Sequence, residues 1–389
     1  MEIRLKTLTP LWTGGVDGTC DRLHETGIIG SLRWWYEVIV RGLGGMACRA
    51  VSDPRCPTKV KIGPSEKQVW CVACDLFGCT GWGRRFRLRF AEDGVQVYAQ
   101  RDQRDQINIR PSGRNRGWYY GAGRLGDDPA SPELHGQLIV LREDQGAVIN
   151  QLIVPLALVA AWGGLGARTQ HGFGVVHATA WEGSRQYAAD LDRFLSYIEA
   201  KKAAHGNAPN VSGAPRLDEF FFSRFRFSLT GEWWERVDGL RTGDGRLRAW
   251  VSKQSVPVAP AIKNQLRFGS YLPTVGNSRQ LENCLFGALS PRQAAKIHAS
   301  SAYPLDDKMW EVRVWGWIPS SLQQREQILS ELHTALTKPE LWNRALGTTL
   351  SHVDYEWKEQ GNPLRCQPPC PEPCTTTAEF LRCLLRGQQ

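Results

Sequence analysis

Residues 147–181 read AVINQLIVPLALVAAWGGLGARTQHGFGVVHATAW, and this stretch sets the plan of the fold. The apolar run over 147–161 predicts a buried helix, which Pro155 breaks or bends. Residues 174–181 predict a strand. Between the two lies a glycine loop, residues 162–174, with five glycines in thirteen positions. A helix that passes through such a loop into a strand is the unit around which the first half of the chain is ordered.

Upstream of this unit the patterns change between strand and helix periods. Residues 2–9 alternate polar and apolar side chains and predict an opening strand. A helix follows, because Leu32, Trp35, Tyr36 and Ile39 have the spacing of one buried helical face. Its start is expected to be capped by Thr26 or Ser31. Residues 85–90 and 136–142 predict two more strands.

The order strand, helix, strand-rich middle, helix, strand is typical of a ferredoxin-like or RRM-like domain. Beyond a linker at 205–215 (HGNAPNVSGAP), the second half follows a similar plan. Its expected strands are 220–230 and 310–318, and its expected helices are 278–288, 291–299 and 320–346, the last interrupted at Pro339. The predicted fold is therefore α+β, with two tandem ferredoxin-like (RRM-like) domains, antiparallel sheets and irregular insertions. The predicted domains are 1–204 and 216–389.

The charge of the chain favours a polyanionic partner. Lys and Arg number 48 against 39 Asp and Glu, which gives a net charge of +9. Arginines concentrate between positions 84 and 124. Arg both forks onto phosphates and stacks on bases, so this choice of residue points to nucleic acid. No apolar run is long enough to cross a bilayer, and the first residues carry charges, so we expect a cytoplasmic protein without a membrane partner.

The glycine loop suits a phosphate better than a nucleotide cofactor. Thr169 stands where the dinucleotide fingerprint needs its third glycine, and no Gly-Lys-Ser/Thr follows for a P-loop. Glycines nevertheless let a backbone approach a ligand closely and aim successive N–H groups at one anion. Arg168 would add charge to such a site, and Gln170 and His171 would add hydrogen bonds. The alternative is a helix end followed by a turn.

The eleven cysteines fall mainly into two groups. In the first, the Cys71-x-x-Cys74 knuckle has zinc-ligand spacing, and Cys48, Cys56 and Cys79 lie near it in sequence. We expect a structural zinc ion held by Cys56, Cys71, Cys74 and Cys79. The alternative is that these are reduced cysteines packed as small apolar side chains. The Pro-rich tail, with Cys366, Cys370, Cys374 and Cys383, is a weaker second candidate.

Four motifs resemble one protein family. They are LTPLWTGG (8–15), GIIGSLRWWYEVIVRGLGG (27–45), CVACDLFGCTGWGRRFRLRF (71–90) and GGLGARTQHGFG (163–174). Together they are similar to the RAMP (repeat-associated mysterious protein) superfamily of CRISPR systems. More narrowly, they resemble the first-numbered RAMP subunit of the Cmr, type III-B, effector complex. The resemblance is strongest over the first 180 residues and continues more loosely through LENCLFGAL (281–289) and RVWGWIP (313–319). The Cys-rich tail departs from it.

The resemblance implies a function and a set of contact residues. It implies two RRM-like domains and a non-catalytic subunit that works in antiviral defence. Such a subunit binds guide RNA, target RNA or both near the guide 3′ end, beside the other Cmr subunits. The residues that would face RNA are those of the glycine loop, the start of the first helix and the arginines after the LFG turn. They are Gly163, Gly164, Gly166, Arg168, Gln170, His171, Gly30, Ser31, Arg33, Arg84 and Arg85.

Two other hypotheses remain open. His171 or His24 could serve as acid or base in a metal-independent endoribonuclease. Alternatively, the chain could be a zinc-stabilised scaffold whose basic face meets an acidic protein.

Overall fold

In the computed structural model, the fold is described for most of the chain. The described residues are 1–15, 20, 22–48, 56–62, 65–91, 107–113, 118–120, 133–141, 145–180, 187–205, 211, 213–240, 255–362, 365 and 374–386.

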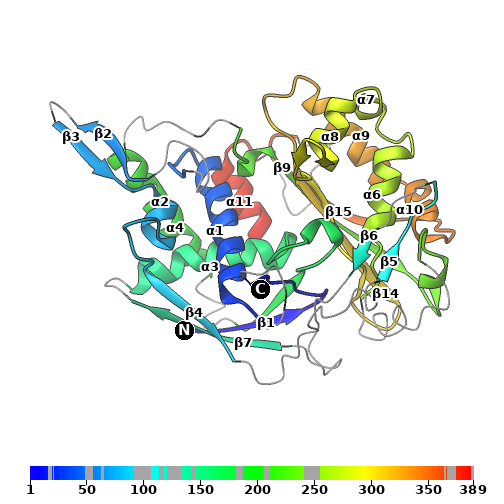
Figure 1. Cartoon of the computed structure of the whole chain (residues 1–389), viewed down its shortest axis with the longest axis horizontal. Coiled ribbons are helices and arrows are strands. Elements are labelled where there is room, and N and C mark those ends of the chain that lie inside the picture. The colour runs from blue at the N-terminus through cyan, green and yellow to red at the C-terminus, as the bar shows by residue number, and fades with distance from the viewer. Residues whose placement is uncertain are drawn as a thin grey trace.

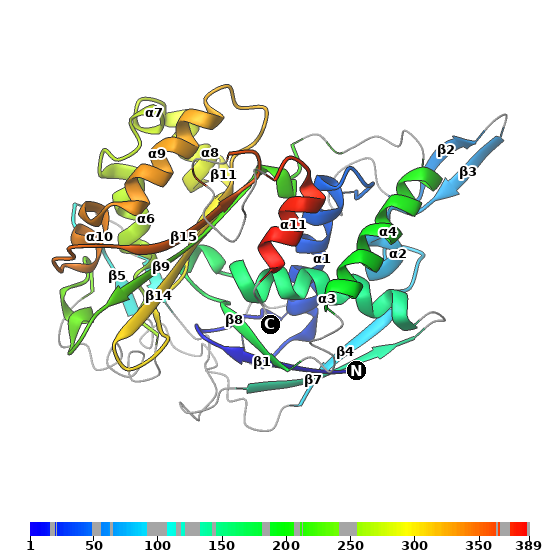
Figure 2. The same ribbon diagram turned by 180° about the vertical axis from the view of Figure 1, so that it is seen from behind.

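The N-terminal half forms a four-stranded antiparallel sheet in the order β4-β7-β1-β8. The strands are β1 (Glu2–Thr7), β4 (Phe86–Phe90), β7 (Glu133–Val140) and β8 (Val176–Ala180). Helices α1 (Glu25–Gly42) and α3 (Gln145–Trp162) lie side by side on one face of it (Figures 1 and 2). A further helix, α4 (Tyr187–His205), packs against α3. The strands predicted for this half are confirmed.

The periodic face of α1 is buried as its spacing predicts. Leu32, Trp35, Tyr36 and Ile39 are each no more than 3% exposed. The predicted capping is wrong, because the helix begins at Glu25 and His24 is its N-cap, with no side-chain cap bond. Thr26 and Ser31 lie inside the helix. Of the two predicted effects of Pro155, the break is wrong, because α3 continues through this residue.

The C-terminal half forms a second antiparallel sheet whose main path is β12-β14-β9-β15. Its strands are β9 (Phe220–Ser228), β12 (Ile297–Ala299), β14 (Met309–Trp317) and β15 (Asp354–Glu359), and β13 (Tyr303–Pro304) also pairs with β14. Helices α6 (Ala259–Phe268), α9 (Arg325–Thr337) and α10 (Pro339–Leu346) share a core with the sheet. Pro339 separates α9 from α10, as the sequence predicts, since proline is favoured at the first position of a helix.

The predicted helix over 291–299 is wrong. These residues form β11 (Arg292–Gln293), paired with β10 (Ala288–Leu289), and then β12. Ile297 and Ala299 are fully buried, whereas the side chain of His298 between them lies on the opposite face of the strand and is partly exposed. Tertiary pairing with β14 therefore overrides a local composition that favours helix.

Both sheets connect their strands in the same way, with the second, third, first and fourth strands of each unit side by side. An α+β chain with two such antiparallel sheets is consistent with ferredoxin-like domains. Each unit has its own apolar core. Packing also crosses the predicted boundary at 205–215. The last helix, α11 (Thr377–Leu385), lies on α3, where Trp162 Nε1 donates to the Leu384 carbonyl at 2.7 Å (Figure 1).

The remaining elements decorate these two units. In the first unit they are the hairpin β2 (Thr58–Ile62) and β3 (Ser65–Val69) and helix α2 (Val72–Phe77). The short pair β5 (Ile107–Ile109) and β6 (Trp118–Tyr120) comes from the first half of the chain but lies against the second unit, whose core includes Ile109 (Figure 1). In the second unit they are α7 (Pro273–Gly276) and α8 (Arg279–Phe286). Three short 3-10 turns also occur along the chain: η2 (Thr169–His171) in the glycine loop, η4 (Leu217–Glu219) and η5 (Trp233–Arg236). Within the described part of the chain, no helix is long and apolar enough to cross a membrane.

Candidate functional site

The glycine loop lies at the junction of the two units and is fixed by hydrogen bonds on three sides. Ala167 N donates to Trp12 O, and Gly174 N donates to Pro10 O, both at 2.8 Å. From α1, Trp35 Nε1 donates to Gly164 O at 3.2 Å. From the second unit, Ser301 N donates to Gly172 O at 2.9 Å. The loop is therefore part of the protein's framework.

The glycines of the loop are explained largely by close packing within the protein. A Cβ on Gly163 would lie 2.6 Å from the Trp35 ring, and one on Gly174 would lie 1.9 Å from Leu165 O. Gly166 and Gly172 have φ of +75° and +94°, a region that L residues rarely adopt. These contacts account for the glycines by packing within the protein, and the backbone clamp for a phosphate stays a prediction.

Arg168 is the cation at the tip of this loop. Its φ is 59°, which is unusual for a residue other than glycine, and it precedes η2. Its guanidinium lies over the Trp12 ring at 4.3 Å from the ring centre. Partial burial lowers the pKa of Arg168, yet at neutral pH it stays charged. This stacking fixes the direction of a charge that is still partly exposed.

Two adjoining cavities flank the loop and form one interdomain cleft. The first, of about 370 Å³, is lined by Gly30 and Ser31 of α1, by Gly164, Gly166 and Thr169 of the loop, and by tryptophans of both units. The second, of about 610 Å³, is lined by Gln170 and His171 and by residues of α6, α8 and β10–β12. His298 lines both cavities. Its Nδ1 lies 3.1 Å from Thr169 Oγ1, and its ring stacks on Trp315.

The second cavity is strongly basic. It is lined by Lys263, Arg267 and Arg279. Both arginines form ion pairs with one carboxylate, that of Glu282, at 2.7 Å. Arg279 is 73% exposed, so much of its charge faces solvent. Burial lowers the pKa of Lys263 to about 7. A cavity with this excess of cations suits an anion.

The two histidines of the cleft are neutral at neutral pH. Burial, followed by the charges of Lys263 and Arg168, lowers the pKa of His171 to about 4. Burial and Lys263 lower the pKa of His298 to about 3. Neutral imidazoles can donate or accept hydrogen bonds here without adding charge.

The structure places the remaining predicted contact residues away from the cleft. Arg33 is turned inward, where it donates to Glu37, to Gly78 O and to Cys74 Sγ. Arg85 donates to both the carboxylate and the carbonyl of Asp75. Arg84 lies over the Phe86 ring. His24 is the N-cap of α1. Of the predicted RNA contacts, the structure brings together the glycine loop, Gly30 and Ser31.

Sequence reasoning missed the basic side of the cleft. Lys263, Arg267, Arg279 and His298 belong to no motif singled out in the second half. A signal was present, because NCLFG (283–287) repeats the LFG of CDLFG (74–78). Arg267 Nη1 donates to Gly287 O at 3.2 Å, just as Arg33 Nη1 donates to Gly78 O at 2.7 Å. Matching the two LFG turns would have directed attention to this region.

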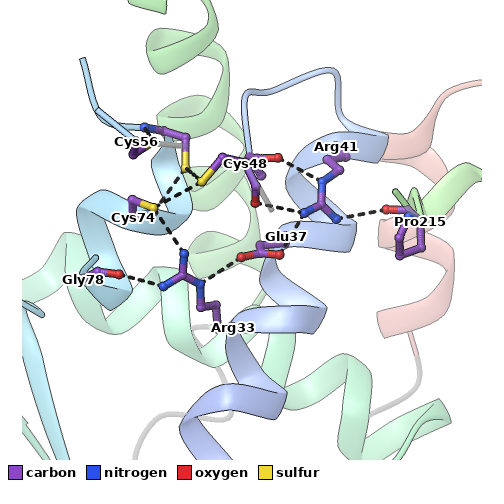
Figure 3. Close-up of polar contacts among 10 residues, drawn as sticks. Arg33, Glu37, Arg41, Cys48, Cys56, Cys74, Gly78 and Pro215 are labelled. Atoms are coloured by element: carbon purple, nitrogen blue, oxygen red, sulfur yellow. Dashed lines mark hydrogen bonds and ion pairs between the residues drawn. The ribbon is translucent and has the colours of Figure 1, made fainter. Parts of the chain in front are cut away.

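Four cysteines of the first unit gather at one point. Within the described part of the chain, the ligand atoms of Cys48, Cys56, Cys71 and Cys74 lie within 4.8 Å of one another, a group that could hold a metal such as zinc. Figure 3 shows Cys48, Cys56 and Cys74 converging beside Arg33. The predicted ligand set is corrected at one position, since Cys48 takes the place expected for Cys79. Cys79 follows the end of α2, and its backbone pairs with Trp82. In the tail, Cys366 and Cys370 lie outside the described residues.

Comparison with known proteins agrees with the motifs. The model of the RAMP superfamily matches residues 4–177. No curated protein matches the chain in sequence. Among solved structures, Cmr1 from Pyrococcus furiosus, in its apo form, is similar with 12% identity, a TM-score of 0.40, and coverage of 83% of this chain and 88% of that chain.

Two chains of Type III-B Cmr-beta structures are similar as well. One comes from the complex bound to cognate target RNA and AMPPnP in the presence of ssDNA, with 10% identity, a TM-score of 0.41, and coverage of 86% and 99%. The other comes from the complex bound to cognate target RNA, with 11% identity, a TM-score of 0.36, and coverage of 82% and 94%. By this sequence match, residues 4–177 of the chain belong to the RAMP superfamily.

Proposed function

We propose that the interdomain cleft binds single-stranded RNA through its phosphates. The observation that carries this proposal is the meeting of the glycine loop, with Arg168 at its tip, and the basic cavity of Lys263, Arg267 and Arg279. Cations that line a groove neutralise phosphates and release counterions, which gives affinity with little sequence preference. Trp34 and Trp317, the two partly exposed tryptophans that line the adjoining cavity, offer ring faces for bases. RNA binding by the purified chain and by cleft variants tests the proposal.

The biological setting we propose is a type III-B CRISPR effector complex. The chain would be its first-numbered RAMP subunit, built of two tandem RRM-like domains. It would contact guide RNA, target RNA or both near the guide 3′ end, with the other Cmr subunits as partners. The RAMP match over residues 4–177 and the four motifs within it support this assignment. In this proposal the subunit is a binder and not an enzyme, and a structural zinc ion stabilises its first domain without taking part in RNA chemistry.

RNA binding is expected to weaken as the pH rises above 7. A phosphate beside Lys263 would favour its charged form and raise its pKa above the value of about 7, so RNA binding takes up a proton in this range. The linkage limits the change to about tenfold in Kd per pH unit. Fluorescence anisotropy between pH 7 and 9 measures it. His171 and His298 stay neutral in this range, so neither of them mimics the effect.

The matched variant for this pH effect is Lys263→Met, which keeps the length of the side chain. It should bind more weakly at pH 7 and show a flat profile up to pH 9. A pH dependence that persists in this variant would show that another group is responsible.

No RNA cleavage by the chain alone is expected in EDTA. His171 is held by burial in its neutral form, and the structure places His24 at the N-cap of α1, outside the cleft. Incubation with repeat RNA and target RNA, followed by denaturing electrophoresis, checks this. Product that appears with the wild type and disappears with His171→Ala would establish the endoribonuclease alternative instead.

A further inference from the structure

The four-cysteine cluster, Cys48, Cys56, Cys71 and Cys74, has the dimensions of a tetrahedral thiolate site. Cys48 Sγ lies 3.4 Å from Cys74 Sγ and 3.6 Å from Cys71 Sγ. Zn–S bonds of about 2.3 Å in a tetrahedron place neighbouring sulfurs roughly 3.8 Å apart. Small outward shifts of the side chains would therefore seat the ion without moving the backbone.

The cluster is also surrounded by donors that suit thiolate ligands. Cys71 N donates to Cys56 Sγ at 3.1 Å, and Cys74 N donates to Cys71 Sγ at 3.3 Å. Arg33 Nη2 donates to Cys74 Sγ at 3.2 Å (Figure 3). Four thiolates around Zn²⁺ carry a net charge of −2, and such donors offset it and orient the ligands.

The second unit supplies a comparison in which Asn283 stands at the position of Cys74. Its LFG turn has nearly the same backbone, since φ is 85° at Gly287 and 84° at Gly78. Arg267 Nη2 donates to Asn283 Oδ1 at 3.2 Å, where Arg33 meets Cys74. The arginine and the turn therefore form without a metal, and the cysteines must serve something that the second unit lacks.

What the first unit has in addition is the β2–β3 hairpin. Cys56 stands two residues before β2, and Cys71 stands two residues after β3. Cys74 lies in α2, and Cys48 follows α1. The hairpin projects from the body of the molecule in both views (Figures 1 and 2). A two-stranded hairpin is only marginally stable without further support.

We propose that Cys48, Cys56, Cys71 and Cys74 bind one structural Zn²⁺ that fastens the base of the β2–β3 hairpin to α1 and α2. All four positions around the ion are filled by protein, as in structural zinc sites, and the thiols lose their protons on binding. The link to α1 runs through Arg41, which donates to Ala47 O at 3.0 Å and Cys48 O at 3.3 Å and pairs with Glu37 (Figure 3). The inference does not depend on RNA binding.

Zinc content of the purified chain, measured by mass spectrometry of the metal, is the direct test. The wild type is expected to carry about one zinc per chain. Cys48→Ser should lose most of it, and Cys79→Ser should keep it, although Cys79 is the nearer in sequence to the Cys71-x-x-Cys74 knuckle. A Cys48→Ser variant that retains full zinc, or a Cys79→Ser variant that loses it, would overturn the ligand set.

Two measurements on the wild type keep the test valid if Cys48→Ser does not fold. Cobalt-exchanged protein should show thiolate-to-cobalt charge transfer and a tetrahedral spectrum, and absorption at the zinc edge should show four sulfur neighbours. Nitrogen or oxygen neighbours would contradict the four-thiolate site. Chelation of the metal should also accelerate proteolysis within residues 56–70 several-fold relative to the rest of the chain, and no change there would refute the fastening role.

Discussion

Gly174→Ala is expected to lower the free energy of unfolding by about 3 kcal/mol or more. Gly174 has φ of +85°, where an alanine is strained, and its Cβ would lie 1.9 Å from Leu165 O. Leu165 N also donates to Gly174 O at 2.8 Å, so the two residues cannot separate without loss of this bond. The added carbon therefore forces the two ends of the glycine loop apart.

Chemical denaturation of the purified chain measures this loss. Gly81→Ala is the matched control, because Gly81 has φ of +80° and open space around its Cβ position. The control carries the backbone cost alone, about 1–2 kcal/mol. Equal destabilisation by the two variants would show that the close approach of Gly174 to Leu165 does not constrain the loop.

The combined variant Arg168→Ala and Arg279→Ala is expected to weaken RNA binding roughly 10- to 100-fold at moderate salt. Arg168 lies in the glycine loop, two residues before Gln170 of the second cavity, and Arg279 lines that cavity at the start of α8. Each would contribute a charge-assisted contact to a phosphate. The loss should be similar for RNAs of different sequence, since phosphate contacts carry no base information.

The control for this variant is Arg193→Ala. Arg193 is 65% exposed on α4 and lines a different cavity, so its replacement removes one positive charge from another surface. Arg193→Ala should weaken RNA binding by less than about twofold relative to the wild type. A comparable loss from Arg193→Ala would mean that net charge, and not the cleft, determines the affinity.

The elements whose side chains repeat with a regular period could be predicted from the sequence. The buried stripe of α1, the alternating strand β4 and the proline break between α9 and α10 each follow from local physics. The helix predicted over residues 291–299 is wrong because the strand that pairs with part of this segment, β14, lies elsewhere in the chain. Local composition cannot report such a partner.

The candidate site was only half accessible to sequence reasoning. The glycine loop stood out, but four of its glycines are required by contacts with Trp12, Trp35, Leu165 and Ser301, three of which are remote in sequence. Cys48 was passed over for Cys79 because spacing within the chain was the only guide. The cations of the basic cavity, Lys263, Arg267 and Arg279, lie on two helices of the second unit, α6 and α8, and only the fold brings them to the glycine loop.

The salt dependence of RNA affinity tests the central claim most directly. Binding of single-stranded RNA should be measured from low to physiological salt for the wild type and for the Arg168→Ala, Arg279→Ala variant. For single strands, log K changes with log salt by about −0.7 per neutralised phosphate. The cleft account predicts a steep wild-type slope that becomes shallower by about 1.4 in the variant. Identical slopes and affinities for the two proteins would contradict it.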